Sequence, residues 1–172
     1  MTTNWAFAGT IIQEAEIIQH AKWRGEETGF SGIKTDLYGA INTETDLYHI
    51  ANPTVNDIKT KTYYLYLTNF NLINVPDVIA GVEVVIAMNR KGRITDETVQ
   101  LRYNNEFIGR NLADFKLDQT KTFGSSTDYW SCELTKAMIN DPSFGLGIRF
   151  QSHPSWPHRD SPMINYIKLR VW

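Results

Sequence analysis

The residue types best suited to chemistry gather in one short segment near the C-terminal end of the chain. His153, His158 and Asp160 lie within eight residues of one another, and imidazole and carboxylate groups are common zinc ligands. Their spacing matches no metal-ligand pattern, and the three prolines of residues 151–162 favour a rigid loop instead. His20 and His49 have no recognisable partners. We therefore expect no metal and no other cofactor.

Two further patterns could support catalysis. Cys132 is the one cysteine, and Asp114 and Asp118 form a carboxylate pair four residues apart, as adjacent Glu26 and Glu27 also do. Paired carboxylates hydrolyse glycosides, but such pairs arise by chance in most sequences. The sequence contains no nucleophile elbow, phosphate loop, dinucleotide fingerprint or zinc-binding helix motif. These observations favour a structural or binding role, and we expect no catalytic residues.

Composition and charge exclude several classes of protein. The 172 residues are 42% hydrophobic and 21% charged, and 17 Lys and Arg against 19 Asp and Glu leave a net charge of -2. A chain of this length can build a core in one domain, and this charge predicts neither nucleic acid nor an anionic membrane as a partner. The first positive charge is Lys22, and no apolar run reaches the ~20 residues of a membrane span. We expect a soluble protein that is made in a reducing cytoplasm.

Most of the chain after residue 60 alternates between apolar and polar residues. A period of two is typical of a strand that packs one face on a core. The runs with this pattern are Thr62–Phe70, Val82–Met88, Thr98–Tyr103, Phe144–Phe150 and Met163–Trp172. Short spacing between the runs favours an all-β, antiparallel β-sandwich or barrel over a parallel sheet.

Side chains on the inward faces of these runs form the predicted core. They are Val82, Val84, Ile86, Val99, Leu101, Trp130, Phe144, Leu146, Ile148, Ile167 and Leu169. Trp130 belongs to this set because it shares the apolar face of an alternating run with Cys132 and Leu134. This run predicts one more strand. Cys132 would then be a small buried hydrophobe.

The segments between the runs carry turn and helix signals. Asn89–Arg93 is typical of a hairpin loop, and Asn104–Asn105 suits a tight turn because Asn tolerates positive φ. Asn140–Ser143 is a further break. Thr135 can cap a short helix over Lys136–Ile139, so we expect at most one or two short helices.

The first third of the chain is less regular. Thr10–Ile18 fits either a helical stripe or an irregular edge strand, and we predict an N-terminal arm over residues 1–31 and a β-sandwich domain over residues 32–172. Apolar side chains near the chain end predict contacts with a partner, although an edge strand of the same core would also explain them. These side chains are Trp5, Phe7, Ile11 and Ile12.

The loop at residues 151–162 is a second predicted partner-binding segment. Its prolines lower the entropy lost on binding, and it presents Trp156, His158 and Arg159. Trp and Arg are enriched at interface hot spots. The alternative is that Trp156 folds back to cover the end of the sandwich.

Four blocks of sequence in a set order and spacing extend this interpretation. They are Tyr63–Phe70 with Ile79–Val84, Ile94–Leu101 with Ile108–Ala113, Thr122–Trp130, and Leu134–Gly145 with Ile164–Leu169. With these blocks the chain resembles a β-sandwich family that occurs in bacteriophage virion and tail proteins. The resemblance implies a jelly-roll-like sandwich, and it implies no catalytic residues.

The resemblance also implies a place in the virion. We expect a capsid decoration (cement) protein or a tail or fibre subunit that binds other virion proteins, with further copies of itself as partners. An aromatic content of 12% leaves one alternative open, namely a carbohydrate-binding module that recognises a host-surface glycan through stacking side chains. Loss of glycan binding on Trp156→Ala would support that alternative.

Overall fold

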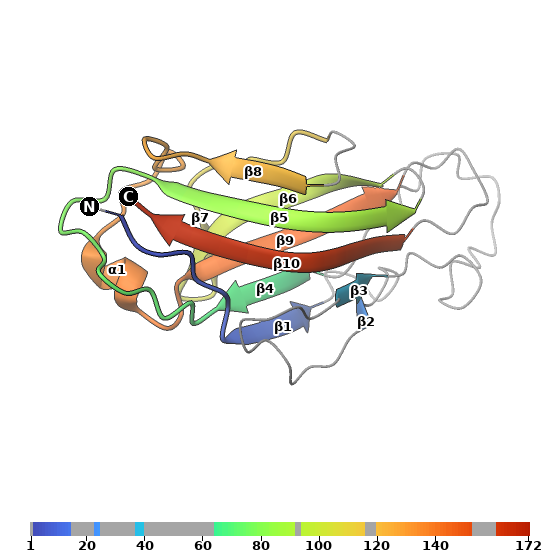
Figure 1. Cartoon of the computed structure of the whole chain (residues 1–172), viewed down its shortest axis with the longest axis horizontal. Helices are drawn as coiled ribbons and strands as arrows, with labels where there is room; N and C mark the ends of the chain where they lie inside the picture. Colours follow the sequence, from blue (N-terminus) through green and yellow to red (C-terminus); the bar gives the residue numbers. More distant parts are fainter. Residues whose placement is uncertain are drawn as a thin grey trace.

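The computed structural model describes residues 2–14, 23–24, 37–39, 64–91, 94–115, 120–152 and 161–172. In these ranges strands in two antiparallel sheets make up almost all of the regular structure (Figure 1), and α1 (Lys136–Asn140) is the single helix. The all-β, antiparallel fold class expected from the alternating runs is therefore confirmed.

Each sheet has five strands. The first sheet has the order β1-β4-β9-β6-β7, with bounds Thr10–Glu14, Tyr64–Thr68, Gly145–Ser152, Ile94–Tyr103 and Glu106–Ile108. The second sheet has the order β2-β3-β10-β5-β8, with bounds Trp23–Arg24, Leu37–Gly39, Ser161–Val171, Val82–Lys91 and Thr120–Gly124.

The pairing of strands β3 to β10 is nested along the chain. β3 pairs with β10, β4 with β9, β5 with β8, and β6 with β7, all antiparallel. Two more antiparallel pairings, β10 with β5 and β9 with β6, join these pairs into two sheets, and β2 with β3 and β1 with β4 add the remaining strands. The chain therefore forms a long antiparallel ribbon that doubles back at the β6–β7 turn.

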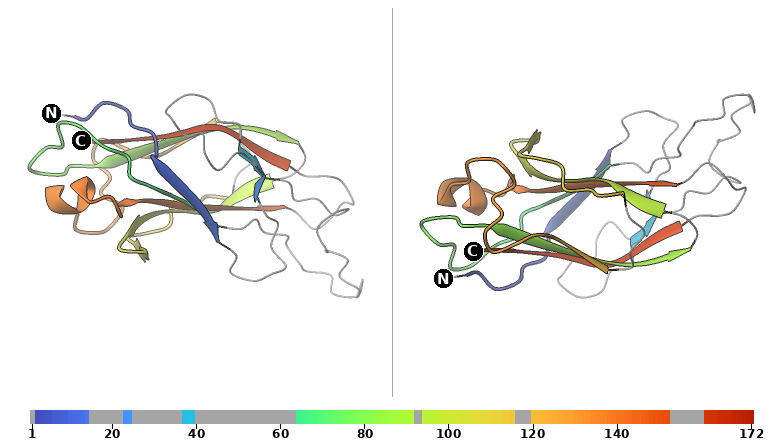
Figure 2. Two further views of the ribbon diagram at one scale, coloured as in Figure 1. Left: turned by 90° about the horizontal axis from the view of Figure 1, so that it is seen from below. Right: turned by 90° about the horizontal axis from the view of Figure 1, so that it is seen from above.

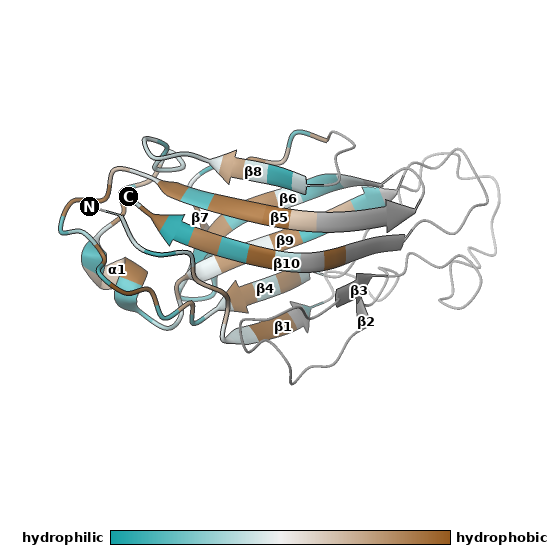
Figure 3. Ribbon diagram, in the orientation of Figure 1, coloured by the Kyte–Doolittle hydropathy of each residue, from teal (hydrophilic) through white to brown (hydrophobic). Residues whose placement is uncertain are grey.

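The two sheets lie one above the other and enclose the core (Figure 2). Along β10, hydrophobic and hydrophilic residues alternate (Figure 3), so that one face of the strand packs on the core. All eleven predicted core side chains are buried, with exposed fractions of 5% or less. A bulge between Ile164 and Tyr166 shifts the register of β10, and Ile164 is buried as well.

Two local predictions are confirmed. Thr135 caps α1, because its Oγ1 accepts a hydrogen bond of 3.2 Å from the amide of Met138. Asn104 and Asn105 form the β6–β7 turn with φ of 51° and 66°, the positive values that a tight hairpin turn requires.

The predicted hairpin at Asn89–Arg93 is wrong. β5, which ends at Lys91, belongs to the second sheet, whereas β6, which starts at Ile94, belongs to the first. The two strands are neighbours in sequence but lie in opposite layers. Loop chemistry identifies a reversal of the chain and does not show whether the returning strand stays in the same sheet.

The predicted strand through Trp130, Cys132 and Leu134 is also wrong. This segment is a turn followed by irregular chain, and Trp130 and Ser131 in the turn have φ of 59° and 57°. Trp130 is nevertheless fully buried, and its indole Nε1 donates a 2.9 Å hydrogen bond to the carbonyl of Val82. Its place in the core follows from this insertion rather than from strand alternation.

Residues 2–14 contact both sheets. Ala6 forms an isolated antiparallel bridge with Leu169 of β10, and Thr3 donates its amide to the carbonyl of Val171. The chain then continues as β1, which pairs with β4 at the edge of the first sheet. Thr10–Glu14 is thus an edge strand, while the predicted domain boundary at residue 31 lies outside the described residues.

Candidate binding surface

Aromatic and arginine side chains cover the outer face of the first sheet. We call this set the aromatic–arginine face; it consists of Tyr64, Tyr66, Phe107, Arg102 and Arg149. The three rings are half-buried, whereas Arg102 and Arg149 are 7% and 4% exposed. The rings therefore cover the guanidinium groups and present the outermost atoms of this face.

Strand register explains why these side chains meet. On β4, Leu65 and Leu67 point into the core, so the two tyrosines on either side of Leu65 point outward. Arg102 of β6 pairs with Phe107 of β7. Because paired residues share a face, the outward side chains of three strands converge.

A glycine completes the floor of the face. Gly147 of β9 pairs with Tyr66 on one side and with Gln100 on the other. A Cβ atom at Gly147 would lie 2.5 Å from Cε1 of Phe107. The missing side chain therefore lets the Phe107 ring lie across β9, where its centroid is 5.5 Å from that of Tyr64 and 6.1 Å from that of Tyr66.

The guanidinium groups stack on the rings. Cζ of Arg102 lies 3.5 Å from the centroid of Tyr66, and Cζ of Arg149 lies 4.0 Å from that of Tyr64. Arg149 is fixed in turn by Glu97, which accepts hydrogen bonds of 2.7 and 3.0 Å from its Nε and Nη2. A bulge between Asp96 and Thr98 places Glu97 opposite this arginine.

The environment of Tyr66 differs from that of a solvent-exposed tyrosine. Burial raises the pKa of the Tyr66 phenol above its ordinary value, and the nearby charge of Arg102 opposes this effect only in part. Glu14, at the end of β1, raises the same pKa. The phenol is therefore neutral at physiological pH and is available as a hydrogen-bond donor and acceptor.

A second cluster of aromatic and basic side chains lies on the other sheet. Trp5 contacts two basic side chains of β10: Nζ of Lys168 is 4.4 Å from its ring centroid, and Cζ of Arg170 is 4.3 Å from it. Arg170 also stacks on Trp172 at 4.4 Å and pairs with Glu83 at 3.0 Å. These contacts anchor the N-terminal segment to β10.

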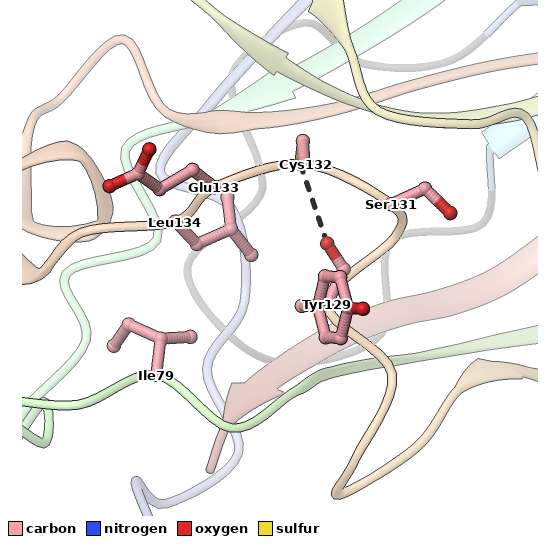
Figure 4. A pocket seen from close by; sticks show the side chains of 6 residues that line it. All are labelled: Ile79, Tyr129, Ser131, Cys132, Glu133 and Leu134. Carbon is pink, nitrogen blue, oxygen red and sulfur yellow. Dashed lines mark hydrogen bonds between the residues drawn. The ribbon is translucent and has the colours of Figure 1, made fainter.

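An open hollow of about 530 Å³ lies beside the loop that carries Cys132 (Figure 4). It is lined by Ile79, Tyr129, Ser131, Cys132, Glu133 and Leu134. The thiol of Cys132 donates a 3.4 Å hydrogen bond to the carbonyl of Tyr129, and burial raises the pKa of this thiol. A raised pKa keeps the sulfur protonated and disfavours a nucleophilic role.

The structure separates the four N-terminal residues that were predicted to bind a partner. Trp5 stacks on β10, Ile11 packs against the core, and Phe7 is 36% exposed. Ile12 pairs with Tyr66 and is 58% exposed, so it borders the aromatic–arginine face. These four side chains therefore lie in different parts of the fold, and their contact with a partner stays a prediction.

The remaining predicted site residues lie outside the described residues. Trp156, His158 and Arg159 all fall in the range 153–160, and the same is true of the possible ligands His153 and Asp160. Among the residues that the structure describes, no group of three His, Cys, Asp or Glu side chains could hold a metal ion.

The alternating runs of the sequence contain Arg102 and Arg149, but the aromatic–arginine face was not identified from them. The signal for it was present in Tyr64 and Tyr66, which are two residues apart and so share one side of a strand. The missing information was which strands lie next to β4.

Comparisons with known proteins add no family to this picture. No protein-family model matches the chain, and no curated protein matches it significantly. In the described ranges, no helix has the length and apolar character needed to cross a lipid bilayer.

Proposed function

We propose that the chain is a jelly-roll β-sandwich that serves as a structural protein of a bacteriophage virion. The nested pairing of β3 to β10 carries this proposal. The orders β3-β10-β5-β8 and β4-β9-β6-β7 are the orders expected when an eight-stranded antiparallel ribbon rolls into two facing sheets, and they support a jelly-roll arrangement. β1 and β2 then extend the sheets at their edges.

Jelly rolls are frequent in viral capsid and lectin domains. The step from this fold to a virion is an analogy, because one fold supports many functions. The resemblance of the four sequence blocks to phage virion and tail proteins points in the same direction. The proposal therefore rests on topology and sequence pattern together.

In this role the chain acts by binding other virion proteins and further copies of itself, as a capsid decoration protein or as a tail or fibre subunit. Several large apolar side chains on its loops support protein contacts, since they are open to solvent in the isolated chain. They include Val78 at 82%, Ile73 at 66% and Phe115 at 52% exposed. The role requires no catalysis, cofactor, nucleic acid or membrane.

Quantitative mass spectrometry of purified phage particles tests this proposal. We expect the chain to remain with the particles through density-gradient purification, at a copy number fixed by the symmetry of its site. A high copy number would indicate the capsid, and a low one the tail or neck. An abundant host cytoplasmic protein, measured in the same samples, sets the level of contamination. A chain found only at that level would contradict the proposal.

A further inference from the structure

We propose that the aromatic–arginine face binds a neutral saccharide, with the rings of Tyr64, Tyr66 and Phe107 as the stacking surface. This proposal concerns one face of the first sheet and does not depend on a place in a virion. A saccharide ring has an apolar face of C–H groups and a rim of hydroxyls, so its recognition requires aromatic faces with polar groups beside them.

The rings are held in fixed positions before any ligand arrives. Tyr64 and Tyr66 are stacked, with centroids 5.6 Å apart and planes 13° from parallel. Arg149 supports Tyr64 and is itself held by the two hydrogen bonds that it donates to Glu97. A surface that is ordered in this way loses little conformational entropy on binding.

An unsatisfied donor lies beneath the rings. Arg102 is 7% exposed and donates from Nη2 to the carbonyl of Asn105 at 2.6 Å, but its buried Nε has no hydrogen-bond partner among the described residues. A buried unpaired donor is unfavourable. The stacking surface therefore has an unpaired polar group directly beneath it, and polar groups beside aromatic faces are what a saccharide requires.

The size of the face favours a small ligand over a protein. A fully exposed aromatic side chain presents ~150–250 Å², and each of these three rings is exposed over about a third of its surface or less, so together they leave roughly 200 Å² or less open to solvent. A specific protein interface buries about 800 Å² on each partner. The open area instead matches a short saccharide that covers two or three rings.

The charge of the face disfavours single-stranded nucleic acid, which also stacks on aromatic side chains. Such binding needs basic groups that are open to the phosphate backbone. Here both arginines are buried, Arg149 is neutralised by Glu97, and the chain as a whole carries a net charge of -2. A neutral ligand fits this balance better than a polyanion.

An oligosaccharide array followed by calorimetry tests the proposal. The array holds neutral oligosaccharides of glucose, galactose, N-acetylglucosamine and N-acetylgalactosamine, and the strongest binder is carried forward. We expect Tyr64→Leu and Tyr66→Leu each to weaken binding by about tenfold or more. Tyr66→Phe keeps the ring and should retain most of the affinity. Tyr129→Leu, at an exposed tyrosine beside the hollow, is the matched control and should change affinity by less than about twofold.

Three results would overturn the proposal. One is that no oligosaccharide on the array binds the wild-type chain. Another is that a folded Tyr66→Leu variant binds as tightly as the wild type. The third is that the face serves another partner, shown by binding of oligo(dT) or by a dimer in light scattering that Tyr66→Leu dissociates. If a variant unfolds, the wild-type chain still tests the proposal. When the selected saccharide is added to it, the amide chemical-shift changes must fall on β4 and β7.

Discussion

At the scale of single residues, Trp130 shows how one side chain can join loop, strand and core. Its backbone has a left-handed φ of 59°, which is unfavourable for a bulky residue. The buried indole offsets this strain by filling the space between the sheets and donating to the carbonyl of Val82. The carboxylate of Asp128 accepts a hydrogen bond from the Trp130 amide at 2.8 Å and holds the turn.

Trp130→Phe should therefore lower the free energy of unfolding by about 1–3 kcal/mol, since it removes the indole donor and part of the packed volume. Urea denaturation followed by circular dichroism measures the change. Tyr129→Phe, at the adjacent and 56% exposed ring, is the control and should stay within about 0.5 kcal/mol of the wild type. Equal stability of the two variants would mean that the indole hydrogen bond contributes nothing.

At the scale of secondary-structure elements, the β6–β7 hairpin fixes the position of Phe107. Its turn depends on positive φ at Asn104 and Asn105. The carbonyl of Asn105 also accepts the hydrogen bond from Arg102. The geometry of the turn and the arrangement of the aromatic–arginine face are thus linked.

Asn105→Gly should leave stability nearly unchanged, because glycine adopts φ of 66° without strain. Asn105→Val should destabilise the protein by about 1–2 kcal/mol, since a left-handed backbone is unfavourable for a β-branched residue. Thermal unfolding of both variants at one pH gives the comparison. A valine variant as stable as the glycine variant would contradict the assigned turn.

The elements differ in how far their sequences determine them. Alternation was enough to place Val99, Leu101 and Leu169 in the core, because every second side chain of a strand points to the same face of the sheet. Alternation does not record which strand lies beside which, so the sequence led to a hairpin at Asn89–Arg93 where the chain crosses between layers. For the same reason the aromatic–arginine face could not be assembled from Tyr66 and Phe107, which are far apart in the sequence.

At the scale of the whole molecule, an ion pair connects the two sheets. Asp96 of β6 and Lys121 of β8 lie 2.7 Å apart, and their side chains are 2% and 10% exposed. Asp114 also pairs with Lys121. A buried carboxylate that loses its partner destabilises a protein strongly.

Lys121→Met should therefore lower the free energy of unfolding by about 3–5 kcal/mol, and chemical denaturation measures this change. Lys136→Met provides the matched control, because the Lys136–Asp77 pair has side chains that are 47% and 90% exposed. Exposed pairs contribute less than about 1 kcal/mol. Similar losses of unfolding free energy for both variants would show that the ion pair between the sheets contributes no more than an exposed pair.

The same lysine predicts how stability depends on alkaline pH. Burial lowers the pKa of Lys121, but hydrogen bonds with Asp114 and Asp96 outweigh burial, so the pKa is raised above its ordinary value. Its contribution to stability is complete below the unfolded-state pKa of about 10.4 and is lost as the pH rises through the higher folded-state pKa. Denaturation midpoints from pH 9 to 12 should fall more steeply for the wild type than for Lys121→Met. Parallel curves would rule out this linkage.

The N-terminal segment also stabilises the whole fold, because it contacts both sheets. Thr3 and Ala8 are 2% and 3% exposed, and Oγ1 of Thr3 accepts a 2.9 Å hydrogen bond from the amide of Val171. Deletion of residues 1–9 would expose the edge of β10 and part of the core. We therefore expect the deletion to lower the denaturation midpoint clearly and not only to weaken assembly.

Thr3→Val isolates this effect without removing the segment. The substitution keeps the shape of the side chain but leaves the buried amide of Val171 without its acceptor, which should destabilise the protein by about 1–3 kcal/mol. Asn4→Ala, at an exposed position next to it, should change stability by less than about 0.5 kcal/mol. If the deletion and Thr3→Val both left the midpoint unchanged while light scattering showed lost assembly, the segment would act on a partner rather than on its own fold. We expect instead that the midpoint falls, because the hydrogen bonds of Thr3 and Ala6 to β10 already pair the backbone groups at this edge within one chain.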